Sequence, residues 1–90
     1  MPTTVKLTAA SSAPVLIVIQ FEGGTPKTLR SNGDTTFQLN QGIFNMGYNI
    51  SAQAQAARVT VSLSGAVMRP IARDIPASGK GNGIRTVRVA

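Results

Sequence analysis

The sequence contains no cysteine, histidine or tryptophan, and only three acidic residues, Glu22, Asp34 and Asp74. Without Cys and His, the chain cannot form zinc fingers, iron–sulfur clusters, thiol redox centres or most catalytic triads. Three acids spread along the sequence are also too few for a calcium site or a two-metal site, because both need clustered oxygen donors. We therefore expect no metal, no cofactor and no disulfide bond in this protein.

Long apolar runs are missing as well. The longest run, residues 15–19, is far shorter than the roughly 20 residues that a transmembrane helix needs. The first residues, Met1-Pro2-Thr3-Thr4, lack the basic start and the apolar stretch of a signal peptide. We expect a soluble chain that is made in the cytoplasm, and its 90 residues predict one domain.

Apolar and polar residues alternate along most of the chain, which predicts strands. Residues 3–9 alternate with period two, as in a half-buried strand. Residues 15–21 are apolar and largely β-branched except for Gln20, which is typical of a central strand or of a strand in a sandwich core. A short strand over residues 26–30 begins with proline and is suited to the edge of a sheet.

The dipeptide Asn32-Gly33 predicts a tight turn. Both central positions of a type I′ turn need positive φ, which Asn and Gly tolerate better than other residues. We therefore expect residues 28–30 and 35–39 to pair as a β-hairpin across this turn.

The clearest alternation covers residues 44–56, where every even position is apolar and the odd positions are polar and uncharged. The phase then reverses, because Val59, Val61 and Leu63 occupy odd positions. A strand cannot change phase without a turn or bulge, which we place at residues 55–58. Residues 51–58 could instead form a short helix, since Ala and Gln favour helices, and the sequence leaves this alternative open.

The last quarter of the chain, residues 66–90, differs from the preceding body, residues 1–65. It holds five basic residues against Asp74 alone, a net +4 of the total +6. Pro70 and Pro76 interrupt regular pairing, and residues 78–83 predict a flexible loop before a final strand over residues 84–89.

Seven or eight short strands with turn residues between them predict an all-β fold, a small antiparallel β-sandwich of Ig-like or related topology. Residues 35–44, Tyr48 and residues 59–61 resemble an element of prealbumin-like and related extracellular β-sandwiches. In that element a strand ends in Leu, a Gly turn follows, and an aromatic strand leads into a Val-rich one. This chain has Ile43-Phe44 where the usual pattern has Tyr, and the resemblance implies a fold only.

Two groups of residues are candidate binding surfaces. The basic residues of the last quarter could bind a polyanion, because Arg and Lys neutralise phosphates. These candidate residues are Arg69, Arg73, Lys80, Arg85 and Arg88. An uncharged polar strand face lacks the Lys and Glu that usually prevent strand association. These candidate self-association residues are Asn45, Asn49, Ser51, Gln53, Thr60, Ser62 and Ser64.

We expect a protein without enzymatic activity, because the three acids lie beside turns or near Pro76 and nothing places a catalytic base. The main hypothesis is a structural module that self-associates or docks on a larger protein assembly, such as a subunit of an appendage, a filament, or a phage or injection particle. In that hypothesis residues 66–90 could add a strand to a neighbour. The alternative is a domain that binds nucleic acid or another anionic surface, although residues 65–90 contain no aromatic side chain for base stacking.

Overall fold

The computed structural model describes residues 2–90, and over this range the alternating pattern forms nine strands and no helix. The strands are β1 (Thr3–Ser11), β2 (Val15–Phe21), β3 (Lys27–Arg30), β4 (Asp34–Leu39), β5 (Gly42–Ala52), β6 (Ala57–Ser64), β7 (Val67–Met68), β8 (Ile71–Ile75) and β9 (Lys80–Val89). The predicted all-β class is therefore confirmed.

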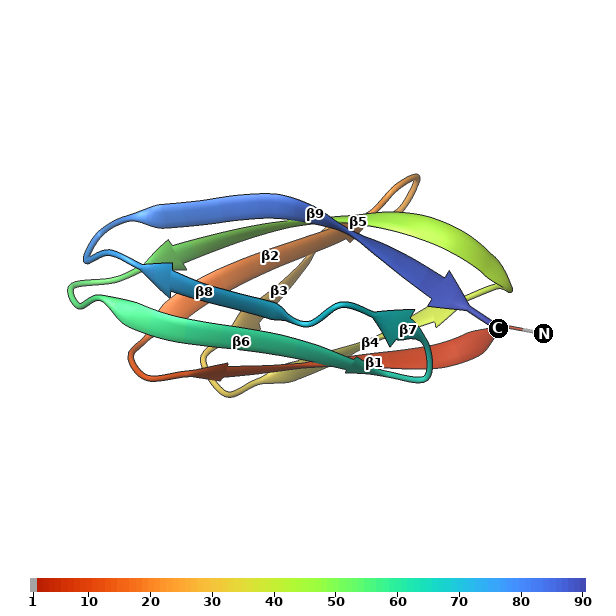
Figure 1. Ribbon diagram of the computed structural model, residues 1–90, viewed down its shortest axis with the longest axis horizontal. Coiled ribbons are helices and arrows are strands. Elements are labelled where there is room, and N and C mark those ends of the chain that lie inside the picture. Colours follow the sequence, from red (N-terminus) through yellow and green to blue (C-terminus); the bar gives the residue numbers. More distant parts are fainter. Residues whose placement is uncertain (1) are drawn as a thin grey trace.

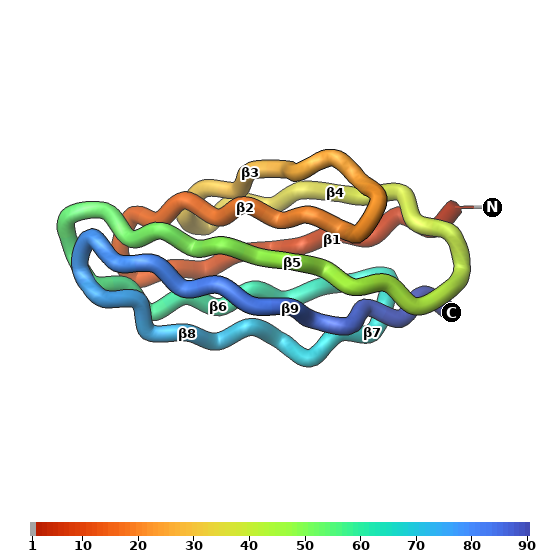
Figure 2. The backbone as a smooth tube through the Cα atoms, turned by 90° about the horizontal axis from the view of Figure 1, so that it is seen from above, coloured from red at the N-terminus to blue at the C-terminus, as the bar shows by residue number. Residues whose placement is uncertain are grey.

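The strands form two antiparallel sheets that pack face to face (Figure 1). Sheet A has the order β4-β1-β6-β8, and sheet B has the order β3-β2-β5-β9-β7. The strands run along the long axis of a body that measures 42 × 20 × 19 Å (Figure 2). The predicted small β-sandwich is confirmed, with β3 at an edge of its sheet as expected.

The core lies between the two sheets, where alternate side chains of every long strand point inward. Sheet A contributes fully buried residues such as Leu7 and Val61, and sheet B contributes residues such as Ile17 and Ile50. At one end, Phe21 of β2 and Phe37 of β4 meet edge to face with ring centroids 4.7 Å apart. Burial of these side chains, at about 25 cal/mol per Å² of apolar surface, is the main stabilising contribution to the fold.

The predicted hairpin at Asn32-Gly33 is wrong. β3 pairs with β2 in sheet B, whereas β4 pairs with β1 in sheet A, so the turn carries the chain from one sheet to the other. Of the two residues only Asn32 has positive φ, 57°, and a bond from the Gly33 amide to the Arg30 carbonyl closes the turn at 3.0 Å. A type I′ hairpin needs positive φ at both residues.

The change of phase after β5 also marks a crossing between sheets. β5 ends at Ala52, residues 53–56 form an irregular connection, and β6 begins at Ala57 in the opposite sheet. The predicted break at residues 55–58 therefore lies two residues too late. Neither a continuous strand nor a helix occupies residues 51–58.

The flexible loop predicted at residues 78–83 is confined to a turn that includes Ser78 and Gly79. From Lys80 onward the prediction is wrong, because β9 begins there and pairs with β5 over ten residues. Its glycines have a packing reason. A Cβ on Gly83 would lie 2.6 Å from the hydroxyl oxygen of Tyr48, and a Cβ on Gly81 would lie 2.6 Å from Cδ1 of Ile75. These glycines make room for side chains that cross the interior, so they do not indicate flexibility.

Candidate interaction surface on sheet B

The predicted self-association residues do not form one surface. Three of them, Asn45, Asn49 and Ser51, lie on β5 in sheet B. The other strand residues, Thr60, Ser62 and Ser64, point outward from β6 in sheet A, on the opposite side of the sandwich. Gln53 lies in the connection between the two strands. The set is divided because β5 and β6 do not pair with each other.

The outer face of sheet A is polar, and its charged side chains form two ion pairs that cancel each other's charge. Lys6 Nζ lies 3.4 Å from the Asp34 carboxylate, and Arg58 Nη1 lies 3.1 Å from the Asp74 carboxylate. All four side chains are more than half exposed, so each pair contributes less than about 1 kcal/mol of stability. The pairs nevertheless neutralise two of the three acids and two of the nine basic residues.

The outer face of sheet B has a different character. Within residues 2–90 the exposed large apolar side chains are Ile43, Val67 and Ile84, with exposed fractions of 68%, 70% and 68%. All three point outward from sheet B, on β5, β7 and β9. Half-buried Leu16 and Val18 of β2 extend the apolar surface of this face.

The net charge lies away from the outer face of sheet A. Within the described range, seven basic residues have no carboxylate within 4.0 Å. Together with Glu22 they account for the whole net charge of +6. These seven residues are Lys27, Arg30, Arg69, Arg73, Lys80, Arg85 and Arg88.

The predicted polyanion-binding residues gather along one lateral side of the sandwich, where β7, β8 and β9 lie opposite β3 (Figure 2). Their side chains point in different directions. Lys80 and Arg88 are exposed at outward positions of β9, and Arg69 is exposed between β7 and β8. Arg73 and Arg85 occupy inward-pointing, half-buried positions.

These two arginines hold Tyr48, which is 4% exposed. Arg73 Nη1 donates to the Tyr48 hydroxyl at 3.1 Å and to the Asn82 carbonyl at 3.1 Å. The Arg85 guanidinium lies 5.7 Å from the centroid of the Tyr48 ring, within the range of a cation–π contact. The cluster lies between β8 and β9, which do not pair with each other, and it closes that side of the core. The sequence did not reveal it, because its members are far apart in the chain.

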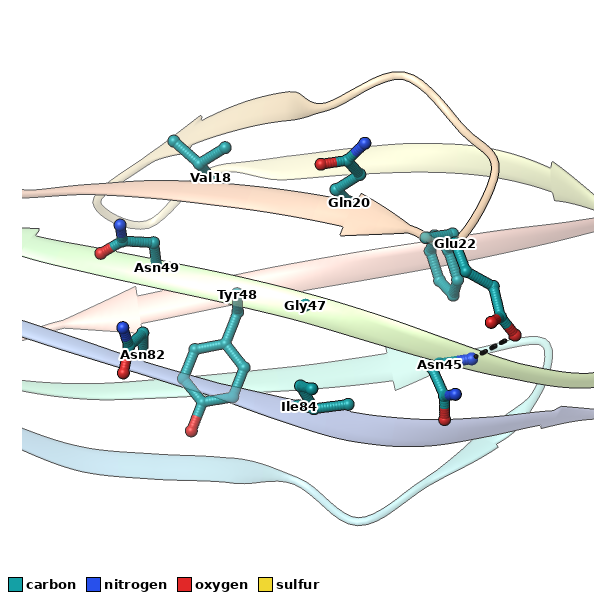
Figure 3. A pocket seen from close by; sticks show the side chains of 10 residues that line it. Val18, Gln20, Glu22, Asn45, Gly47, Tyr48, Asn49, Asn82 and Ile84 are labelled. Atoms are coloured by element: carbon teal, nitrogen blue, oxygen red, sulfur yellow. Dashed lines mark hydrogen bonds between the residues drawn. The ribbon is translucent and has the colours of Figure 1, made fainter.

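A shallow hollow of about 480 Å³ lies on the outer face of sheet B (Figure 3). Its centre is Gly47 of β5, which stands opposite Gln20 of β2 and Ile84 of β9 in the strand register. At one end, the backbone N–H of Asn45 donates a hydrogen bond to the Glu22 carboxylate at 3.1 Å. The hollow thus combines apolar and amide side chains, and those around Gly47 are Val18, Gln20, Glu22, Asn45, Asn49, Asn82 and Ile84.

Nothing in residues 2–90 brings three or more His, Cys, Asp or Glu side chains together as metal ligands. That part of the chain also has no helix of the length and apolar character needed to cross a membrane. No protein-family model, curated protein or solved structure matches the chain.

Proposed function

We propose that this protein is a non-enzymatic structural module that assembles with other protein chains through the outer face of sheet B. One observation carries the proposal: Ile43, Val67 and Ile84 all protrude from that face, while the outer face of sheet A is polar and has its charges paired. Exposed apolar side chains that gather on one face of a soluble protein mark an interaction site.

The distribution of charge on sheet B supports the same function. β5, the middle strand of the sheet, has no charged side chain from Gly42 to Ala52. Of the basic residues, Arg30 lies on the edge strand β3 and Lys80 at the start of β9, whereas Arg88 lies near the other end of β9, between Ile43 and Val67 in the register. Protein interfaces commonly have a centre that is depleted of charge and a polar rim.

The setting that we propose is a larger particle in which this chain is one subunit, such as an appendage, a filament or a phage or injection particle. We propose kinship with Ig-like and prealbumin-like sandwiches at the level of fold alone. It is supported by the two antiparallel sheets and contributes no functional residue.

The test compares wild-type protein with the triple variant Ile43→Ser/Val67→Ser/Ile84→Ser and with a control, Thr8→Ser/Thr36→Ser/Thr60→Ser, on sheet A. Size-exclusion chromatography with light scattering is run on each protein, both purified and added to extract of its source cells. We expect wild type and control to elute in a complex and the triple variant to elute as a monomer. Identical elution of the three proteins, or a wild-type monomer in both settings, would contradict the proposal.

A second function, polyanion binding, is supported by Arg69, Lys80 and Arg88, which are exposed and have no carboxylate partner in residues 2–90. We expect retention on heparin to fall steeply with salt. Arg69→Ser/Lys80→Ser/Arg88→Ser should elute at clearly lower salt than Lys6→Ser/Lys27→Ser/Arg58→Ser, which loses the same charge elsewhere. Equal retention of the two variants would show that only net charge matters and that this side is not a binding site.

A further inference from the structure

Gly47 is the one glycine of the chain whose missing side chain the fold does not explain. A glycine in the interior of a strand weakens it and often marks a place where another chain or ligand approaches closely. A Cβ on Gly47 would meet only the Gln20 carbonyl oxygen, at an ordinary 3.8 Å, and its φ lies outside the left-handed region. Each of the other eight glycines either has positive φ or would bring a Cβ within 3.2 Å of a neighbouring atom.

A protruding apolar side chain lies directly beside Gly47. Ile84 of β9 is opposite Gly47 in the register, and it is 68% exposed. Figure 3 shows Ile84 next to Gly47 along the surface, with Gln20 on the other side. One face therefore carries a projecting side chain and, in the neighbouring strand, a position without a side chain.

We infer that the partner of this face is a second copy of the same chain, related by a two-fold axis that runs parallel to the strands between β5 and β9. Such an axis places β5 of one copy over β9 of the other. Ile84 of each copy then enters the hollow at Gly47 of the other copy. Contacts that are reciprocal in this way define an isologous dimer interface. This inference rests on the proposed function and names the partner.

The residues on either side of Gly47 and Ile84 would also meet compatible partners across this parallel axis. It brings Asn49 over Asn82 and Asn45 over Thr86, pairs that can exchange hydrogen bonds, because they are opposite each other in the register of one copy. It also brings Lys80 over Ser51 and Arg88 over Ile43, so no cation faces a cation at either end of β9.

A two-fold axis between the copies that is perpendicular to the strands is disfavoured, because it would bring like charges together. An axis perpendicular to the strands at Gly47 would place β9 over β9 and bring Lys80 against Arg88, since these residues lie four positions on either side of Ile84. The parallel axis instead brings Glu22, which is bonded beside Asn45, toward Arg69 at the end of β7. The distribution of charge therefore selects the parallel axis.

The area of the outer face of sheet B limits how strongly two copies can associate. β5 and β9 pair over ten residues. Together with the seven residues of β2 and the two of β7, at about 3.3 Å per residue and about 4.8 Å between strands, they cover roughly 450 Å² per copy. This area is below that of stable interfaces and in the range of weak, transient ones, so we expect a dimer that forms only at high protein concentration. Each copy carries a charge of +6, so added salt should strengthen the dimer by screening repulsion.

Sedimentation equilibrium of the purified chain, from about 10 µM to about 1 mM, tests the inference with two variants. Gly47→Val fills the hollow, and its Cβ has room in the fold. Ile84→Ala removes the projection. We expect each to raise the dissociation constant at least about tenfold, because two apolar contacts are lost in every dimer. Ser62→Val, which adds the same side chain to the outer face of sheet A, should leave the constant unchanged.

Mixing the two variants is the decisive measurement. In the mixed dimer, Ile84 of the Gly47→Val copy enters the intact hollow of the Ile84→Ala copy, and the introduced valine lies against the introduced alanine. We expect the mixture to recover dimerisation that neither variant shows alone.

Four results would each overturn the inference: a wild-type monomer at about 1 mM, unchanged dimerisation of either variant, a mixture of the variants that does not recover dimerisation, or a dimer that weakens with added salt.

The proposed function can still hold if the inference about a second copy fails. If the purified chain is monomeric but its complex in extract still depends on Ile43, Val67 and Ile84, the face binds a different protein and only the inference about a second copy is wrong.

Discussion

Replacing Gly83 by alanine should destabilise the sandwich by pressing on Tyr48. The added Cβ would lie 2.6 Å from the Tyr48 hydroxyl oxygen and 2.9 Å from two ring carbons, where ordinary contacts begin at 3.4 Å. Tyr48 cannot move freely, because Arg73 bonds its hydroxyl and Arg85 lies over its ring. Overpacking of this kind costs about 1–3 kcal/mol, offset by about 0.5–1 kcal/mol from replacing glycine in a strand. We expect a net loss of about 1–2 kcal/mol.

Gly47→Ala is the matched control, since it makes the same change in the adjacent strand. Its Cβ would make only an ordinary contact, at 3.8 Å from the Gln20 carbonyl oxygen, so only the gain of about 0.5–1 kcal/mol should remain. The two substitutions should thus change stability in opposite directions. In urea unfolding followed by far-UV circular dichroism, at a slope of about 1 kcal/mol per molar, the midpoint should fall by about 1–2 M for Gly83→Ala and rise by about 0.5–1 M for Gly47→Ala.

A double-mutant cycle with Tyr48→Phe tests whether contact with Tyr48 causes the loss of stability in Gly83→Ala. Tyr48→Phe removes the closest atom, so Gly83→Ala should be less costly in that background, with a coupling energy of about 0.5–2 kcal/mol. Simple additivity of the two changes, or a Gly83→Ala protein as stable as Gly47→Ala, would refute the argument that Tyr48 requires the glycine.

Three further predictions concern stability and use the same urea assay. Ile50→Ala opens a cavity in the core and should cost about 2–5 kcal/mol, whereas Ile43→Ala, at an exposed position, should stay within about 0.5 kcal/mol; similar values for the two would contradict the assigned core. Arg73→Ala should cost about 1–2 kcal/mol and alter the near-UV circular dichroism of Tyr48, because the tyrosine hydroxyl loses its donor; an unchanged near-UV spectrum would argue against that contact. Asp74→Asn breaks an exposed ion pair and should cost less than about 1 kcal/mol, so a larger loss would mean that this pair is more than a surface contact.

The strands that the sequence predicted well are those whose signal is local. Residues 15–21 match β2, and the apolar even positions of β5 from Met46 to Ala52 are buried as expected. Alternation shows which side of a strand faces the core, because side chains alternate between the two faces of a sheet. It therefore predicted the class of the fold and much of its core.

Alternation does not show which strands pair, and the wrong predictions from the sequence arose for this reason. Asn32-Gly33 has the composition of a hairpin turn, but β3 and β4 belong to different sheets. For the same reason the predicted polar surface was divided between β5 and β6. Gly81 and Gly83 suggested a loop, although side chains from distant strands account for both. The candidate surface on sheet B depends on such distant pairing, which is why Asn45, Asn49 and Ser51 of β5 were the only residues of this face predicted for self-association.

The order of pairing also has a consequence for how the chain reaches its folded state. Within residues 2–90 only β2 and β3 are consecutive strands that pair with each other, and β1 must find partners as far away as Ser64. Folds built from distant contacts form slowly, on the order of milliseconds to seconds. During synthesis, β5 is made nearly thirty residues before β9, its longest partner, begins at Lys80. One edge of the central strand of sheet B therefore stays without its partner until the last residues are made, and this interval is when the chain is most open to pairing with another copy.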